Sequence, residues 1–359
     1  MDSENQPMVD IIIVSWNHAK FLPALFESLS KVNYPKSFLR VHLVINKDGD
    51  GSFEVAQSAK TLLTNVNEFI IHEPHANLGF SGGNNLAITW SAQRDGEFVY
   101  LLNPDTTVDP DFLNNAIKIF NKYPRVGSVQ SLLLRGNTPE YINSIGNKLH
   151  FLGFGYCGGD MQDISHVPTE PQEIGYSSGA GVLISQKVLS EVGLLDETLF
   201  SYHEDLDLGW RIMLAGYKNI FAPDSVVYHF YEFSRSIQKW MLMERNRWIV
   251  VLKNYSFFTL LILLPSLIAT DAAIWTFSLK GGWFWQKVKA MSWFLKPSSW
   301  KYIINGRLHI KQIRKVSDAN ILSIMTYKIE YQELRSGLAE KIANPFWKAL
   351  YTATRIIIK

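Results

Sequence analysis

Short apolar runs that alternate with amphipathic stretches constrain the fold of this 359-residue chain more than any other feature. Val9–Val14, Leu39–Ile45 and Glu68–His72 are expected to be strands, because each is a short apolar run that turn residues close. The stretches between them, Phe21–Leu29 and Phe53–Leu63, are predicted helices. Strands and helices that alternate at these lengths predict an α/β fold with a mainly parallel central sheet and right-handed crossovers.

The same alternation continues to about residue 230. Further strands are expected at Glu97–Leu102, Gly127–Leu134, Val182–Ile184, Tyr217–Phe221 and Ser225–Tyr228, and further helices at about Asn77–Ala92, Asp111–Tyr123 and Glu204–Leu214. Pro139–Ile174 is glycine-rich and is expected to form loops and a hairpin that flank a site.

A carboxylate directly follows one of the apolar strands, in the segment Tyr100–Asp105. Pro104 cannot donate a hydrogen bond to a neighbouring strand, so pairing should stop at about Asn103. Asp105 would then lie at the carboxyl edge of the sheet, where open α/β proteins bind ligands. An acid in that place suits a hard divalent cation that also holds phosphate oxygens, and an Asx-type turn is the alternative.

Asn77–Asn85 combines three glycines and three asparagines at the start of a predicted helix. Such a loop lets the backbone approach a ligand closely and presents amide groups at a helix N-terminus. It is not a dinucleotide fingerprint, because no G-x-G-x-x-G motif follows the first strand. A tight turn with a helix cap is the structural alternative.

A second acidic centre lies at Glu204 and Asp205, in the first turn of a predicted helix that Gly216 ends. Capping of that helix is the alternative role for both acids. Arg211 could pair with one of them or face a phosphate. His229 follows a strand, where a histidine is more often structural than a ligand.

The charge divides the chain into two unlike parts. Up to His229 there are 15 Lys and Arg against 26 Asp and Glu, and from Phe230 onward there are 20 against 7. Eight of the 11 tryptophans lie in the second part, which points to nucleic acid or an anionic membrane surface. The single cysteine, Cys157, excludes a disulfide framework and a cysteine-rich zinc site.

The tail has the features of a membrane-associated segment. Phe257–Leu279 is mostly apolar but contains Pro265 and Asp271, so a re-entrant or interfacial hairpin is favoured over a full crossing. Tryptophans that alternate with lysines in 283–301 predict an in-plane membrane anchor. The alternative is a helical subdomain that packs on the catalytic body, and nucleic-acid binding is disfavoured because nothing upstream reads bases.

Several of these motifs occur together in one family. The chain resembles the inverting family-two glycosyltransferases of GT-A fold, and most closely their bacterial rhamnosyltransferase-like branch. The matching segments are Ile11–Asn17, Asn77–Asn85, Leu102–Asp105, Ser178–Ala180, Val192–Glu197 with Phe200, Glu204–Leu208, and His229 with Ser234. They cover about Val9–Ser236, and their order and spacing together are specific.

The resemblance implies a role for each acidic centre. Asn103-Pro104-Asp105 is similar to the branch's version of the D-x-D metal motif, with Asp105 bridging Mg²⁺ or Mn²⁺ to the donor diphosphate and Asn103 in place of the first acid. His229 matches a further metal contact, which favours manganese slightly. Asp205 matches the catalytic base, and Glu204 would support it.

The resemblance also implies where substrates bind. Relatives usually carry Asp-Asn after the second strand, whereas this chain has Ile45-Asn46, so the acid that reads a pyrimidine ring is missing. The branch favours a dTDP-linked deoxysugar such as rhamnose, with a UDP-sugar as the main competitor. The expected donor-binding residues are Ser15, Trp16, Asn17, Asn46, Asn77, Gly79, Phe80, Gly83, Asn84, Asn103, Pro104, Asp105 and Arg211, and the expected acceptor-side residues are Ser178, Gly179 and Trp210.

From these features we expect a catalytic domain over 1–236, with nucleotide-sugar binding in about 9–110 and acceptor binding in about 126–236. A helical, basic, tryptophan-rich region would occupy 237–359. The expected protein is a transferase, peripheral or monotopic on the cytoplasmic face of the inner membrane, that elongates a lipid-linked or cell-surface glycan. A non-catalytic sugar-binding homologue and a nucleotidyltransferase are the alternatives, and the latter would need a basic phosphate-binding loop after the first strand, where only Lys20 is present.

Overall fold

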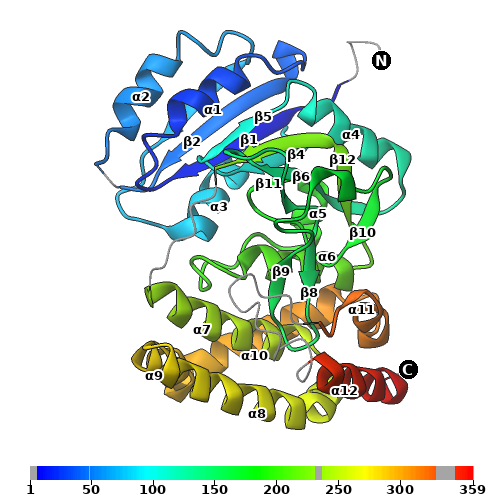
Figure 1. Cartoon of the computed structure of the whole chain (residues 1–359). Coiled ribbons are helices and arrows are strands. Elements are labelled where there is room, and N and C mark those ends of the chain that lie inside the picture. The colour runs from blue at the N-terminus through cyan, green and yellow to red at the C-terminus, as the bar shows by residue number, and fades with distance from the viewer. Residues whose placement is uncertain (1–5, 48, 231–236, 329–343, 359) are drawn as a thin grey trace. The chain divides into compact units, whose positions relative to one another are not determined.

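The computed structural model describes residues 6–47, 49–230, 237–328 and 344–358 (Figure 1). It divides into two compact units. The first contains residues 1–147, 157–212 and 217–232, and the second contains 148–156, 213–216 and 233–359. Ser234 and the predicted domain boundary at 236 lie outside the described residues.

A mixed sheet forms the centre of the first unit, with the strand order β3-β2-β1-β4-β11-β6-β12-β10. Six strands run in one direction: β1 (Val9–Ser15), β2 (Leu39–Ile45), β3 (Glu68–His72), β4 (Phe98–Leu102), β6 (Val126–Arg135) and β12 (Lys218–His229). The opposite direction is taken by β5 (Thr106–Val108), β7 (Ile142–Ser144), β10 (Gln172–Ile174) and β11 (Gly181–Ser185). β8 (Asn147–Leu149) and β9 (Gly155–Cys157) pair separately. The predicted α/β class is therefore confirmed, and the strands that run in reverse make the sheet mixed.

Helices cover both faces of this sheet. They are α1 (Leu22–Leu29), α2 (Ser52–Ala59), α3 (Gly79–Ala92), α4 (Phe112–Lys122), α5 (Gln186–Val192) and α6 (Glu204–Leu214), with 3-10 turns at Lys36–Phe38 and Ile164–His166. α1, α2 and α4 share a core with Ile11 and Ile13 of β1. On the opposite face, Gly83 of α3 lies so close to Val14 that a Cβ would be 2.7 Å from its Cγ1. Since successive strand residues point to opposite faces, both sides of β1 are buried.

The side chain of Asp10, on β1, is a buried carboxylate that binds residues of neighbouring elements. Asp10 on β1 accepts hydrogen bonds from Arg40 at 2.6 and 2.7 Å and from Ser91 at 2.6 Å, and it pairs with His42 at 2.7 Å. Burial would raise the pKa of Asp10, but these partners, with His42 and Arg40 foremost, hold it below the usual value. Its charge is thus compensated inside the core.

One strand differs from the prediction. The sequence predicts two short strands at 217–221 and 225–228, whereas β12 runs through both with a register irregularity between Ala222 and Val226. Pro223 lies in this irregularity, since it lacks an N–H for the ladder. Ser225 there donates to the Phe112 carbonyl at 2.7 Å, which ties β12 to α4.

The second unit is helical in its described part. It contains α7 (Ile237–Asn254), α8 (Phe257–Lys280), α9 (Phe284–Ser292), a 3-10 turn (Trp293–Leu295), α10 (Pro297–Ile313), α11 (Asp318–Ile324) and α12 (Asn344–Ile357) (Figure 1). Pro265 and Asp271 do not interrupt α8, which is one continuous helix rather than the hairpin that the sequence suggests. Among the described residues, α8 alone is long and apolar enough to cross a membrane.

Gly79 begins α3 in a left-handed conformation, with φ of +70°. A Cβ there would lie 2.5 Å from the Phe200 carbonyl oxygen, so Gly79→Ala should suffer both backbone strain and a collision with main chain. Gly49 is the matched control, because its φ is +68° and nothing lies within 4 Å of its Cβ position. We expect Gly49→Ala to cost about 1–2 kcal/mol of unfolding free energy and Gly79→Ala clearly more, measured by urea denaturation. Equal losses would contradict the close contact.

Candidate active site

The site lies at the edge of the sheet where the six parallel strands end. Asp105 follows β4, and His229 is the last residue of β12. The Asp105 Oδ1 and the His229 Nε2 are 3.3 Å apart, and Asn103 Nδ2 lies 3.5 Å from the same nitrogen. Burial would raise the pKa of Asp105, but the hydrogen bond and charge of His229, together with the charge of His18, hold it below the usual value. Asp105 is therefore ionised at neutral pH.

The Asp105–His229 pair fits two neighbouring ligands of one cation. Such ligands, each about 2.1 Å from an octahedral ion, lie about 3.0 Å apart. The His229 Nδ1 faces the Asn143 Oδ1 at 2.9 Å, a contact that orients the ring with Nε2 toward Asp105. Among the described residues no group of three or more His, Cys, Asp or Glu side chains could hold a metal. Further ligands would have to come from a substrate.

Asp205 and Glu204 open α6 and differ in environment. The Asp205 Oδ1 accepts from the Leu206 N–H at 2.7 Å and its Oδ2 from the Gly179 N–H at 3.4 Å. Burial raises the pKa of Asp205 to about 6, although these N–H groups oppose the shift. Burial, and then the charge of Asp205, raises the pKa of Glu204 well above its usual range. Asp205 is therefore mainly charged at neutral pH, and the neutral form of Glu204 is favoured relative to an exposed glutamate.

Two backbone contacts bring the acidic centres to one edge. The Asn103 N–H donates to the Ala180 carbonyl at 3.3 Å, because β11 runs antiparallel to β4 and begins where β4 ends. The next residue back, Gly179, is the one whose N–H binds Asp205. A small cavity between these elements is lined by Phe80, Gly179 and Asp205, among others. The position of β11 thus links the segments that carry the two acidic centres at one edge of the sheet.

A second, larger cavity lies beyond the ends of β2 and β3. Its volume is about 930 Å³, and Ile45, Lys47, Phe53, Glu73 and His75 are among the residues that line it. Trp16 and Asn17, which follow β1, are exposed at the same edge of the sheet. These positions agree with the predicted nucleoside side of the site.

Several predicted donor ligands are instead buried supports of this edge. Ser15 is fully buried, and its hydroxyl lies 3.0 Å from that of Ser52. Asn46 is 1% exposed and binds the loop before α3, donating to the Gly79 carbonyl at 2.9 Å and accepting from the Leu78 N–H at 3.2 Å. The donor-binding role expected of the Asn46 side chain is therefore wrong, because its amide is buried and already bonded to this loop.

The glycine and asparagine loop is held in the same way. Asn77 accepts from the Gly79 N–H at 2.8 Å, and Asn84 donates to the Phe80 carbonyl at 2.9 Å and is 1% exposed. Val14 occupies the space that a side chain at position 83 would need, and Pro104 is also buried. The loop shapes the edge mainly through its backbone.

Two residues of α6 require correction. Arg211 pairs with Asp207 at 2.8 Å and donates to the carbonyls of Val192, Gly193 and Leu194 at 2.7–2.8 Å. It is 4% exposed, so its guanidinium anchors α6 rather than a donor phosphate. Trp210 is fully buried and cannot line an acceptor site. On the acceptor side, Gly179 lies beside Asp205, and the Ser178 N–H donates to Gln130 Oε1 at 2.8 Å.

The sequence missed three residues close to the Asp105–His229 pair. His18 adds its charge to the environment of Asp105, and Asn143 orients His229. Arg135, the last residue of β6, is paired in register with His229, so both side chains lie on one face of the sheet. Arg135 also donates to Asp160 at 2.6 Å. His18 follows the end of β1 and Arg135 ends β6, a signal that many structural residues share, while Asn143 lies within β7 and has no such signal.

Comparison with known proteins agrees with this geometry. A family described as glycosyltransferase like family 2 matches residues 7–250. N-acetylglucosaminyl-diphospho-decaprenol L-rhamnosyltransferase of Mycobacterium tuberculosis is 25% identical over 172 residues, covering 43% of this chain and 56% of that protein. The chain therefore spans little more than half the length of this relative.

Solved structures share the fold. The structure of GalNAc-T7 with UDP, GalNAc and Mn²⁺ superposes with a TM-score of 0.57 at 18% identity, covering 70% of this chain and 48% of that one. A Pyrobaculum calidifontis mannosyltransferase in complex with GDP-Man and Mn²⁺ has a TM-score of 0.50 at 14% identity, with 99% and 88% covered. These likenesses show the GT-A-like architecture expected from the sequence. With more than half of its length matched by the family, the chain belongs to the family-two glycosyltransferases.

Proposed function

We propose that the chain is a metal-dependent inverting glycosyltransferase that moves a sugar from a nucleoside diphosphate to an acceptor hydroxyl. One observation carries the proposal: Asp105 with His229, and Asp205 beside Gly179, are joined at one sheet edge through the Asn103–Ala180 contact. A one-step displacement at a sugar carbon needs a cation to stabilise the leaving diphosphate and a base to take the acceptor proton. The Asp105–His229 pair suits the first function, and Asp205 with its raised pKa suits the second.

Asp205 acts as the general base in this proposal. Its carboxylate takes the proton of the attacking acceptor hydroxyl, and the Gly179 and Leu206 N–H groups hold it in place. Burial and the Asp205 charge raise the pKa of Glu204 and so disfavour a second negative charge beside the base. A divalent cation held by Asp105 and His229 would neutralise the charge that develops on the departing diphosphate. Attack from the face opposite the leaving group inverts the anomeric configuration.

The donor and acceptor follow from the family resemblance and the relatives. The rhamnosyltransferase relative supports a deoxyhexose such as rhamnose from a dTDP-sugar, with a UDP-sugar as the alternative. The solved neighbours were obtained with Mn²⁺, which supports manganese over magnesium. The decaprenol-linked substrate in that relative's name supports a polyprenyl-linked glycan acceptor. Catalysis would reside in residues 1–236, and residues 237–359 would hold the enzyme peripherally or monotopically on the cytoplasmic face of the inner membrane.

Asp205→Asn should remove the base without changing the size of the side chain. We expect sugar transfer to fall by about 10²–10⁴-fold, while binding of the nucleotide sugar, measured by calorimetry, stays near the wild-type value. Glu204→Gln is the matched control, because it makes the same carboxylate-to-amide change at the neighbouring residue, which is not the proposed base. We expect its loss of sugar transfer to be less than about tenfold. Equal turnover of Asp205→Asn and wild type would refute the base assignment, and absence of turnover in the wild type itself would favour a non-catalytic homologue.

The raised pKa of Asp205 predicts a pH profile. A base works when it is deprotonated, so kcat/KM should rise with pH through a midpoint near 6 and level off above it. An Asp at its ordinary pKa of about 3.9 would give a flat profile over the same range. The measurement is the transfer rate at low donor concentration from pH 5 to 8, at constant ionic strength. A flat profile would contradict the assignment of Asp205 as the general base.

Asn143→Leu tests the Asp105–His229 pair as a cation site without changing either of the two residues. Loss of the 2.9 Å contact frees the His229 ring, so Mn²⁺ affinity in the presence of UDP should fall by about 10–100-fold. Electron paramagnetic resonance reports free Mn²⁺ directly and does not depend on turnover. Asn137→Leu, at an exposed position, is the control. Unchanged Mn²⁺ affinity in Asn143→Leu would exclude His229 as a ligand.

A further inference from the structure

The exposed face of α8 is apolar along its length up to Leu279, except for Thr276. Phe257 is 69% exposed, Ile268 59% and Leu279 62%. The residues that face outward recur every three or four positions: Phe257, Phe258, Leu261, Leu264, Pro265, Ile268, Ala269, Ala272, Ala273, Thr276 and Leu279. Thr276 donates its hydroxyl to the Ala272 carbonyl at 3.1 Å, so its polar group is already satisfied within the helix. An exposed apolar stripe of this length is not expected on a helix that faces water.

The buried side of α8 carries most of its polar residues. Thr259, Ser266, Thr270 and Ser278 are buried there beside Leu263 and Leu267. The hydroxyls of Thr259, Thr270 and Ser278 donate to Asp318, the Ser266 carbonyl and the Trp275 carbonyl. A water-facing helix hides its apolar residues and exposes its polar ones. α8 does the reverse, which is the pattern of a helix whose outer surroundings are hydrocarbon.

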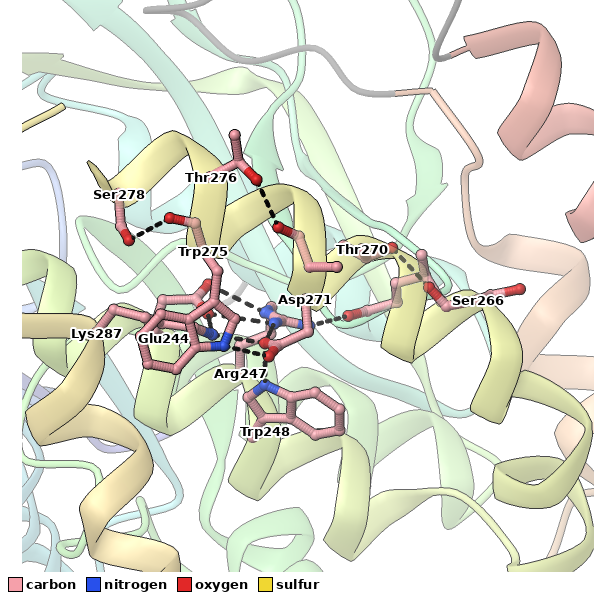
Figure 2. A network of polar contacts seen from close by, with 12 residues as sticks. Glu244, Arg247, Trp248, Ser266, Thr270, Asp271, Trp275, Thr276, Ser278 and Lys287 are labelled. Atoms are coloured by element: carbon pink, nitrogen blue, oxygen red, sulfur yellow. Dashed lines mark hydrogen bonds and ion pairs between the residues drawn. The ribbon is translucent and has the colours of Figure 1, made fainter. Parts of the chain in front are cut away.

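Asp271 fixes the orientation of α8 at its centre. Figure 2 shows its carboxylate pointing into a cluster from α7 and α9. It pairs with Lys287 at 2.5 Å and Arg247 at 3.5 Å, and it accepts from the indole N–H groups of Trp248 and Trp275 at 3.0 and 2.9 Å. Glu244 completes the cluster, 2.7 Å from Lys287 and 3.2 Å from Arg247. Two acids and two bases balance, so the buried charges hold α8 against its neighbours with the apolar side outward.

The exposed charge in the described part of the second unit is all of one sign. The acids there are Glu244, Asp271 and Asp318, and each pairs with Arg or Lys. The exposed charged residues are Lys148, Lys280, Lys289, Lys296, Lys301, Lys311, Lys315, Lys328, Lys348 and Arg355. Exposed Trp285, Leu295 and Trp300 stand between several of these lysines in the sequence. This surface complements anionic lipid and would repel a second copy of itself.

We infer that α8 lies in the plane of an anionic lipid bilayer, with its Phe257–Leu279 face in the acyl region and its Asp271 side toward the protein. The inference deepens the proposed membrane location and rests on that part of the proposed function. At 24 residues α8 is about 36 Å long, enough to cross a hydrocarbon core of about 30 Å. A crossing would, however, carry Arg247, Glu244 and Lys287 into hydrocarbon, or strip Asp271 of its partners. An in-plane helix avoids both costs.

Depth measurements distinguish this arrangement from a crossing. In the full chain with Cys157→Ser, single variants Leu261→Cys, Ile268→Cys and Leu279→Cys are labelled with an environment-sensitive fluorophore. They are then bound to phosphatidylcholine vesicles that contain phosphatidylglycerol, with quenchers at known depths. We expect one shared shallow depth for all three labels and no quenching of a Leu62→Cys control on the first unit. A deep Ile268 between shallower ends would overturn the inference in favour of a crossing.

A polar variant tests the face itself. Leu261→Gln/Leu264→Gln/Ile268→Gln should lower the vesicle partition coefficient at least about tenfold, because three exposed side chains lose their transfer into the bilayer. The control Leu62→Gln/Leu86→Gln changes exposed leucines of the first unit and should bind as wild type does. Unchanged vesicle binding of the triple variant would contradict the inference. Loss of a dimer in lipid-free sedimentation, with vesicle binding kept, would assign the face to a second copy instead.

Donor hydrolysis without vesicles separates this inference from the proposed function. The triple variant should hydrolyse the nucleotide sugar at the wild-type rate, since none of its residues belongs to the candidate active site. If neither protein hydrolyses any donor while the binding difference persists, the proposed reaction fails and the membrane face stands. If hydrolysis is normal and the triple variant still binds vesicles, only the membrane face is wrong.

Discussion

The hydrogen bond from the Asn103 N–H to the Ala180 carbonyl is the contact on which the candidate site depends. It exists because β11 enters the sheet in reverse between β4 and β6. A parallel strand brings the residues that follow it to the ligand-binding edge, whereas a reversed strand brings those that precede it. Gly179 therefore arrives beside the end of β4, and its N–H positions Asp205.

The same edge explains how acids of different character serve one reaction. Asp105 is kept ionised by the histidine 3.3 Å away, in spite of burial. Asp205 has backbone N–H groups as partners, and burial raises its pKa toward neutrality. The candidate site thus combines an ionised carboxylate suited to a cation with a carboxylate suited to proton transfer. The difference comes from their neighbours rather than from the residue type.

In the second unit, ion pairing and the exposure of apolar surface are parts of one arrangement. Buried pairs contribute little net stability, because desolvation offsets much of their attraction. They do specify geometry, since Asp271 can be buried only where Lys287, Arg247 and two indoles meet it. That requirement leaves the opposite side of α8 to face outward, and that side is apolar.

Local pattern was enough to predict β1–β4, β6, β11, α1–α4 and α6, with the acids that follow β4 and open α6, but not β5 or α5. The alternation of apolar and polar residues, and the breaks at Pro104 and Gly216, depend only on nearby residues. The boundaries of these elements can therefore be read from the sequence. It could not reveal side-chain direction within those elements. Arg211, Trp210, Ser15 and Asn46 carry the chemistry of ligand-binding residues, yet packing turned all four inward.

The sequence by itself determined the α/β order, the family and the two acidic centres, because these depend on residue identity and spacing. Tertiary structure alone decided that β11 is reversed, that Asn143 and Arg135 adjoin His229, and that α8 turns its polar side inward. Each of these depends on contacts between residues far apart in the chain. No local periodicity records such contacts, because they exist only once the separate elements pack together.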